Sequence, residues 1–283
     1  MRLNRQGTNF LPKHLIIPDT QVAPGTPLDH FVWIGRAINE YKPDVLMHIG
    51  DHWDMHAAST WSAAGSKDKE GSRLQHDIDA GNEALELLEK SMEGYKPKQK
   101  IILRGNHEDR LSRLVASDPR LEGVVGFHLF NDKELGWTPV EYFNGSPNII
   151  HIDGIAYAHY FANPNTGKPI AGTIQNRLSK IGSSFVQGHQ QGLQQGNQQY
   201  ATGVTRYGVV AGSCYLHDES YKGVANNHWR GIMVLNEVRN GSFCEMPLTL
   251  DYLCRKYEGM SIGQYMRKKY KNARQRFTIA NED

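Results

Sequence analysis

The first hundred residues alternate between short apolar runs and segments in which apolar side chains recur at helical spacing. The runs at 14–18, 44–49 and 100–103 predict buried strands, and the segments 29–41 and 74–92 between them predict helices. Strands that alternate with helices in this way are typical of a parallel sheet with right-handed crossovers. The sequence therefore predicts an α/β fold for this part of the chain.

From residue 149 onward the pattern changes to short strands separated by glycine and asparagine turns. Five such strands are predicted, at 149–152, 155–159, 185–188, 207–211 and 232–235. Taken alone, this pattern favours a second, largely antiparallel sheet. The glutamine-rich stretch 187–199 is interrupted by glycines, which favours a loop or a hairpin turn.

Three predicted strands of the first half end in side chains with metal-ligand chemistry, namely Asp19, Asp51 and Asn106. The carboxyl ends of strands in an open α/β sheet are where ligands bind, so these side chains are expected to lie together. His159 and His189 follow two predicted strands of the second half in the same way. Carboxylate, carboxamide and imidazole groups suit divalent ions such as Mn, Fe, Zn or Mg. The sequence therefore predicts a metal centre.

The residues around Asn106 add chemistry for a phosphate ester. Asp51 can bridge two ions, a geometry that serves in-line displacement at phosphorus. His107 is next to a ligand without being required as one, so it is available as a general acid for the leaving oxygen. Arg104 and Arg110 are candidates for contact with the anion. The plainer alternatives are a solvated arginine before a turn and, for a lone strand histidine, a core residue.

The series resembles the motifs of the calcineurin-like metallophosphoesterase superfamily, which read DxH, GDxxD, GNH(D/E), a lone His, and GHxH. The matching segments of this chain are Asp19-Thr20-Gln21, Gly50-Asp51-His52-Trp53-Asp54, Gly105-Asn106-His107-Glu108, His159 and Gly188-His189-Gln190-Gln191. The resemblance covers roughly residues 13–215. It implies a four-layer αββα sandwich of two mixed β-sheets flanked by helices, and phosphoester hydrolysis by a metal-bound hydroxide.

The resemblance also implies a role for each motif residue. Asp51 would bridge two ions, Asp19 would help to hold the first, and the second would be held by Asn106, His159 and His189. His107 would be the acid, with Asp54 as the partner that orients it or a loop. In the phosphoprotein-phosphatase branch an arginine at the place of Arg104 grips the phosphate. That branch's Gly-Asp-x-x-Asp-Arg-Gly pattern is absent here, because Met55 follows Asp54.

Two glutamines depart from the family pattern. Gln21 and Gln191 stand where DxH and GHxH end in histidine, and both histidines would serve the first ion. Two changes at the same metal site indicate a coordinated substitution. A glutamine offers a neutral amide oxygen, which favours a labile Mn or Mg over Zn or Fe. We therefore expect two divalent ions, Mn ahead of Mg, Fe, Zn or Ni, with a weakened first position. The alternative is an empty first position, with one ion or no activity.

Charge is distributed unevenly along the chain. Residues 255–283 hold eight Lys or Arg and three acidic residues, a net +5, whereas the whole chain carries +2 and residues 1–254 therefore −3. We expect a metallophosphoesterase domain over 1–254 and a basic C-terminal tail or helix over 255–283. Such a tail favours a polyanion such as DNA; a solvated helix face is the plainer alternative.

These observations predict a metal-dependent phosphodiesterase or nuclease that acts on nucleic acid or nucleotides. The preference rests on the basic tail and on resemblance to exonuclease-like and phage-encoded members with similar Asp-Thr-Gln starts. A phosphomonoesterase is one alternative, supported by Arg104. A degenerate binding or scaffold protein is another, supported by Gln21 and Gln191. Without a signal peptide or membrane-spanning run, and with three cysteines expected as buried thiols, the predicted location is the cytoplasm of a cell or phage-infected host.

Overall fold

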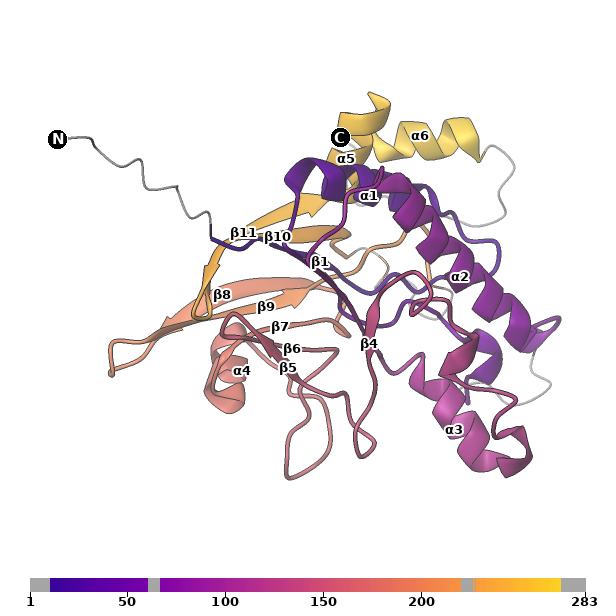
Figure 1. The fold of residues 1–283 in the computed structure, drawn as a ribbon, viewed down its shortest axis with the longest axis horizontal. Coiled ribbons are helices and arrows are strands. Elements are labelled where there is room, and N and C mark those ends of the chain that lie inside the picture. The colour runs from indigo at the N-terminus through magenta and orange to yellow at the C-terminus, as the bar shows by residue number, and fades with distance from the viewer. Residues whose placement is uncertain (1–10, 61–66, 220–225, 227, 271–283) are drawn as a thin grey trace.

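Two β-sheets pack face to face, with helices on both outer faces (Figure 1). The structure is a computed structural model that describes residues 11–60, 67–219, 226 and 228–270. The first sheet has the order β11-β10-β1-β2-β3-β4, and the second has the order β5-β6-β7-β9-β8. The first sheet's strands are β1 (His14–Ile17), β2 (Val45–His48), β3 (Gln99–Leu103), β4 (Thr138–Val140), β10 (Gly231–Arg239) and β11 (Ser242–Thr249). The expected four-layer αββα sandwich is confirmed.

Strand β1 shows why the first-half strands appear as continuous apolar runs. Leu15 and Ile17 pack into the core beneath the helices, whereas Ile16 packs into the core between the two sheets. Successive side chains of a strand point to opposite faces, so a strand covered on both sides needs apolar residues at every position. The three predicted strands are confirmed as β1, β2 and β3, which pair in parallel.

Helices cover the two outer faces. They are α1 (Asp29–Tyr41), α2 (Leu74–Ser91), α3 (Asp109–Ser117) and α4 (Ile174–Ile181), with short 3-10 turns at His56–Ala58, Lys67–Lys69, Pro119–Leu121 and Phe127–Leu129. Helices α1 and α2 pack on the first sheet, and α4 packs on the second through Ile174 and Leu178. The predicted helices 29–41 and 74–92 are confirmed as α1 and α2. Their apolar residues recur at helical spacing because one face of each helix packs on the sheet.

The second sheet differs from the antiparallel arrangement favoured by the strand pattern. Its strands are β5 (Ile150–Ile152), β6 (Ile155–Ala158), β7 (Ser184–Gln187), β8 (Leu193–Gln199) and β9 (Thr205–Ala211). The centre β6-β7-β9 is parallel, and only the edge strands β5 and β8 are antiparallel to their neighbours. The prediction was wrong because α4, a crossover helix of eight residues, gives no clear signal among turn residues. The predicted strand 232–235 lies in β10 and pairs with β1 in the first sheet.

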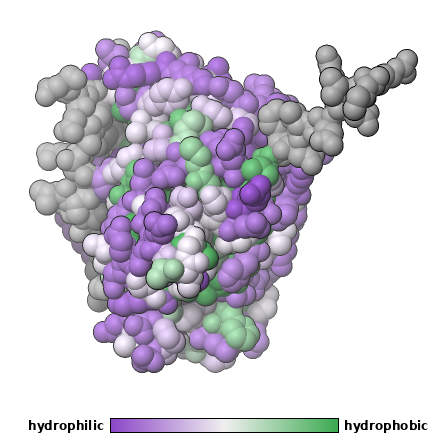
Figure 2. All heavy atoms as spheres, turned by 90° about the vertical axis from the view of Figure 1, so that its left-hand side faces the viewer, coloured by the Kyte–Doolittle hydropathy of each residue, from purple (hydrophilic) through white to green (hydrophobic). Residues whose placement is uncertain are grey.

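The glutamine-rich stretch 187–199 is part loop, at 188–192, and part strand. Residues 193–199 make up β8, which pairs with β9 across a hairpin. The strand lies at the sheet edge, with its odd-numbered residues from Gln195 on exposed. Polar side chains are tolerated there because one face and one edge meet solvent. The side of the molecule that carries this hairpin is mainly hydrophilic, with small separated apolar patches (Figure 2).

The chain after β11 continues as two helices, α5 (Leu250–Glu258) and α6 (Ile262–Lys269). The expected boundary after residue 254 falls inside α5. Both helices contact α1, since the Trp33 indole donates to Glu258 at 2.9 Å and the Tyr265 hydroxyl donates to Asp29 at 2.8 Å. The remainder of the expected basic tail, 271–283, lies outside the described residues. Among the residues described, no helix is both long and apolar enough to cross a membrane.

The cysteines are free in the structure. Cys214 and Cys254 are buried as expected, whereas Cys244 is exposed on β11, so the prediction of buried thiols was wrong for this residue.

Candidate active site

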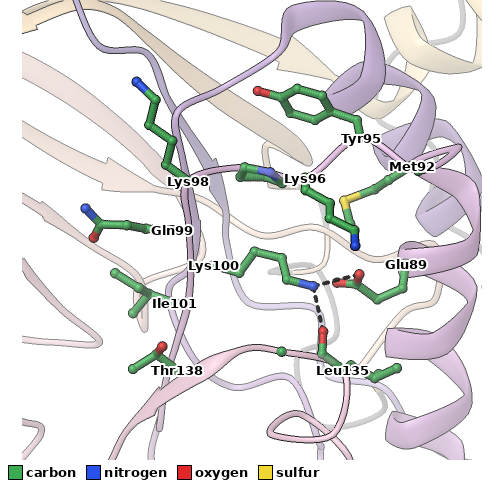
Figure 3. A pocket seen from close by; sticks show the side chains of 13 residues that line it. Glu89, Met92, Tyr95, Lys96, Lys98, Gln99, Lys100, Ile101, Leu135 and Thr138 are labelled. Carbon is green, nitrogen blue, oxygen red and sulfur yellow. Dashed lines mark hydrogen bonds and ion pairs between the residues drawn. The ribbon is translucent and has the colours of Figure 1, made fainter.

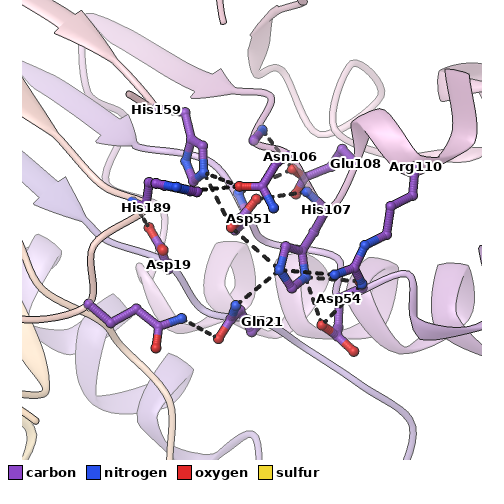
Figure 4. Close-up of polar contacts among 12 residues, drawn as sticks. Asp19, Gln21, Asp51, Asp54, Asn106, His107, Glu108, Arg110, His159 and His189 are labelled. Atoms are coloured by element: carbon purple, nitrogen blue, oxygen red, sulfur yellow. Dashed lines mark hydrogen bonds and ion pairs between the residues drawn. The ribbon is translucent and has the colours of Figure 1, made fainter. Parts of the chain in front are cut away.

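Side chains that follow strands of both sheets lie close together at one place (Figure 4). Neighbouring parallel strands β1, β2 and β3 are followed by Asp19, Asp51 and Asn106. Strands β6 and β7 of the facing sheet are followed by His159 and His189. The strand order thus brings together side chains that are far apart in the sequence.

Asp51, His159 and His189 form a group of potential metal ligands. One ligand atom from each lies within 4.8 Å of the other two, and this is the one such group found among the described residues. The Asn106 side-chain oxygen lies 3.1 Å from His159 Nε2 and 2.7 Å from His189 Nδ1. Two imidazole nitrogens, a carboxylate and an amide oxygen therefore converge on one small volume. The four residues are called the histidine half of the site.

His159 is fixed in orientation by the chain behind it. Its Nδ1 lies 3.0 Å from the carbonyl oxygen of Ile49, which can only accept, so Nδ1 carries hydrogen and Nε2 faces the site. Burial lowers the pKa of His159, but the Asp51 carboxylate at 3.3 Å, together with Asp19 and Glu108, outweighs burial and raises the pKa to about 9. Burial likewise raises the pKa of Asp51, yet His107 and His159 hold it well below its ordinary value. The Asp51 carboxylate therefore stays ionised.

Close backbone approach at the site depends on Gly105. A Cβ atom at this position would lie 2.0 Å from an Asp51 carboxylate oxygen. Asp51 itself has a φ of 52°, a left-handed conformation that is uncommon for residues other than glycine. The turn after β2 therefore needs support from elsewhere in the chain.

Glu108 provides that support. Its buried carboxylate accepts hydrogen bonds from the backbone N–H groups of Asp51, His52, Trp53 and Gly105, at 2.5–3.1 Å. One side chain thus ties the turn after β2 to the turn after β3. Glu108 belongs to the motif, but its role was not predicted, because three of its four partners are backbone groups more than fifty residues away.

His107 lies between a carboxylate and the ligand group. Its Nδ1 is 2.7 Å from Asp54 Oδ1, and its Nε2 faces Asp51 Oδ2 at 3.8 Å. Burial lowers the pKa of His107, but Asp51 and Asp54 outweigh burial and raise the pKa above its ordinary value. Arg110 donates to the Asp54 carbonyl at 2.6 Å and reaches His107 Nε2 at 3.3 Å. The predicted acid, its orienting carboxylate and one arginine are therefore in contact.

The other side of the site contains Asp19, Gln21 and Gln191, called the glutamine half. The Gln191 amide nitrogen donates to the Gln21 side-chain oxygen at 2.7 Å. Asp19 accepts from the His189 backbone N–H at 3.1 Å through one oxygen, and its other oxygen is buried without a hydrogen-bond partner among the described residues. Burial raises the pKa of Asp19 to about 7.

Comparison with known proteins agrees with this geometry. The family model of the calcineurin-like phosphoesterases matches residues 13–206, which is more than half of the chain. The chain belongs to the calcineurin-like phosphoesterase family. No curated protein matches the sequence. Membership shows a metal-dependent phosphoester hydrolase, and it implies a divalent metal site.

The two halves fit the divalent ions of a calcineurin-like phosphoesterase unequally. The histidine half offers two imidazoles, a carboxylate and an amide oxygen within bonding reach of one position. This donor set suits a borderline divalent ion. The glutamine half offers the unpartnered oxygen of Asp19, but its two amides are already bonded to each other. The residues present thus fit one ion well and a second ion poorly.

Arg104 does not reach the site. Its side chain is buried, paired with the equally buried carboxylate of Asp132 and lying 5.0–5.4 Å from the ring centres of Trp53, Phe127 and Phe130. The prediction that Arg104 contacts the phosphate was therefore wrong. Arg104 instead forms a buried ion pair with Asp132. Asp132 lies in the segment 118–147, where the sequence showed only mixed turn residues, so its pairing had no signal.

A separate cavity of about 630 Å³ opens at the other end of β3 (Figure 3). Lys96, Lys98 and Lys100 line it, and Lys100 forms an ion pair with Glu89 at 2.7 Å. The cavity contains none of the family's motif residues. The group at the carboxyl ends of the strands is therefore the candidate phosphoesterase site.

Proposed function

We propose that this chain is a manganese-dependent phosphodiesterase that acts on nucleic acid or nucleotides. The single observation that supports it most is the histidine half facing a correctly oriented acid. Asp51 contacts both parts, through its Oδ2 at 3.3 Å from His159 and through its Oδ1, which accepts from the His107 backbone at 2.9 Å. The carboxylate and amide oxygens of this half suit manganese.

The metal is held by Asp51, Asn106, His159 and His189 in this proposal. When bound, a divalent ion supplies an activated water and neutralises charge on the phosphate. Asp54 accepts the Nδ1 hydrogen of His107, which leaves Nε2 facing the ligand group. When the imidazole is doubly protonated, the Nε2 hydrogen is the one available to a leaving oxygen. Asp54 keeps the ring in place during the transfer.

The surroundings of the two arginines favour a diester over a monoester. A monoester carries one more negative charge, which an additional guanidinium would help to bind. Arg104 is buried against Asp132 and offers nothing to a substrate. Arg110 is part-buried beside His107 and remains the arginine candidate for the phosphate group.

The nucleic-acid preference rests on the positive charge of residues 255–283. Three cations of the described part of this segment form ion pairs and are therefore partly neutralised. The pairs are Arg255–Asp251, Lys256–Glu40 and Lys269–Asp29. Lys268 is exposed on α6 and is a better probe. Lys268→Glu should weaken oligonucleotide binding and reduce the salt dependence of log Kd by about one unit. Lys133→Glu, exposed before β4, is the matched control.

The function is tested by comparing bis(p-nitrophenyl) phosphate with p-nitrophenyl phosphate in the presence of Mn, Mg, Ni or Zn. We expect a higher kcat/KM for the diester, the highest rate with Mn, and loss of activity with a chelator. Hydrolysis of the monoester alone would establish a phosphomonoesterase instead.

The His107→Ala variant separates an enzyme from a scaffold. It should lower kcat about 100-fold or more, with Mn content unchanged. His128→Ala, an exposed histidine outside the site, is the control. If no metal supports cleavage of either ester and His107→Ala changes nothing, the chain is a binding protein on this fold.

A further inference from the structure

The glutamine half contains a continuous chain of hydrogen bonds. Tyr215 donates through its hydroxyl to the Gln191 side-chain oxygen at 2.8 Å. Gln191 donates to the Gln21 side-chain oxygen at 2.7 Å, and the Gln21 amide nitrogen lies 3.3 Å from His107 Nε2. Three side chains from three separate segments thus lead directly to the acid. They are called the amide chain.

In this arrangement the side-chain oxygens of both glutamines, the atoms that an ion would bind, already accept hydrogen bonds. A glutamine has one ligand atom for a hard or borderline cation, its side-chain oxygen. In a contact between two amides, one oxygen faces the other residue's NH₂ whichever way the amides are turned. Here the second oxygen is also engaged, by Tyr215. An ion at this position would compete with the hydrogen bonds that the amide chain already makes.

The amide chain is held in a confined position. Gln21 is 1% exposed, Tyr215 is fully buried, and the Tyr215 ring stacks on His217 with ring centres 4.6 Å apart. Gln21 has a φ of 39°, and its backbone N–H donates to the Asp51 carbonyl at 2.8 Å. A side chain fixed at its backbone and at its amide has little freedom to turn toward an ion.

The carboxylates alone leave a first ion weakly held. One buried oxygen of Asp19 has no hydrogen-bond partner among the residues that the structure describes, and Asp51 already contacts His107 and His159. An ion bound through two carboxylates keeps most of its water, as Mg²⁺ commonly does. The histidine half offers two imidazole nitrogens in addition to its oxygens, so an ion there has more protein ligands.

We propose that Gln21, Gln191 and Tyr215 replace the ligands of the first ion by a hydrogen-bonded chain that holds His107, so that this enzyme retains one divalent ion. The inference rests on the proposed function, because it assigns the remaining ion to the histidine half of that site. Turning both amides over reverses every donor and acceptor, so the same chain can donate to His107 Nε2 or accept from it. Tyr215 is a positioning residue that was not predicted from the sequence.

The ion count is tested on the full-length protein, stripped of metal, loaded with excess Mn²⁺ and desalted. We expect one Mn per chain by elemental analysis and the six-line electron paramagnetic resonance spectrum of an isolated Mn²⁺ ion. The double variant Gln21→His/Gln191→His should bind a second Mn and show a spin-coupled spectrum, because imidazole is a good ligand and both amides are gone. Gln195→His, exposed on β8, controls for the addition of a histidine.

The outcomes separate this inference from the proposed function. Two tightly bound, coupled ions in the unmodified protein, together with diesterase activity, would overturn the one-ion inference and leave the function standing. No bound Mn and no hydrolysis would overturn both. One ion with diesterase activity supports both.

The positioning part is tested with Tyr215→Phe, which removes only the hydroxyl. We expect kcat to fall about tenfold with KM and Mn content unchanged, in line with the loss of an outer partner, and a small fall in the thermal midpoint because a buried hydrogen bond is lost. A shift in midpoint with kcat unchanged would show that Tyr215 only stabilises the fold, and would overturn its positioning role.

Discussion

The histidine half and the glutamine half occupy equivalent places at the ends of facing strands but are built differently. In the histidine half each imidazole presents a nitrogen to a shared volume, and His159 is oriented from behind by Ile49. In the glutamine half the side chains bond to each other, and only one oxygen of Asp19 remains without a partner among the described residues. In our proposal the two halves differ in donor chemistry, because two imidazoles in one half correspond to two neutral amides in the other.

Substitution of a proposed ligand should produce the largest difference in Mn content between the two halves. His159→Asn should lower both Mn content and diesterase activity more than about 100-fold, because it removes an imidazole from the ligand group. Gln191→Asn, in the other half, should leave Mn content unchanged. His151→Asn, an exposed histidine on β5, controls for histidine removal. Equal loss of metal in the two halves would contradict the account.

Removal of Arg104 should affect stability rather than binding. Arg104→Met leaves the Asp132 carboxylate buried without its partner and should cost about 3–5 kcal/mol in urea unfolding, with KM little changed. Arg110→Met, beside the site, should show the reverse pattern, with a raised KM and a smaller loss of stability. A raised KM for the folded Arg104→Met protein would restore Arg104 as a phosphate contact.

Glu108→Gln tests whether the histidine half depends on the turn that supports Asp51, because it weakens the hydrogen bonds that hold this turn. The amide of glutamine accepts with only one of its two groups, so some of the four backbone N–H groups lose their partner. The expected cost is about 2 kcal/mol of unfolding free energy, with weaker Mn binding. Glu134→Gln, on an exposed side chain, should change stability by less than about 0.5 kcal/mol. An unchanged Mn affinity would show that the turn holds Asp51 without Glu108.

The histidine half was predictable because strand order and chemistry agree. Each ligand follows a strand, and parallel strands place their carboxyl ends at one edge. The outer strands of the first sheet were less accessible to prediction. Strand β4, Thr138–Val140, is short and partly exposed, so its sequence lacks the apolar run of a buried strand.

The parts that escaped prediction depend on contacts between distant residues. Arg104 is paired with Asp132 and Gln191 with Tyr215, and neither spacing follows a helical or strand period. The same holds for β8, whose glutamines resemble a loop until β9 supplies the hydrogen bonds of a ladder. Position in a motif predicted where Gln21 and Gln191 lie, but not that they bind each other.

An anomalous-scattering map from crystals soaked in Mn²⁺ tests the central claim most directly. The account predicts one strong peak, surrounded by Asp51, Asn106, His159 and His189, with the Gln21–Gln191 hydrogen bond intact beside it. A second peak of equal height with Gln21 or Gln191 as a ligand would contradict it, as would the absence of any peak in the histidine half.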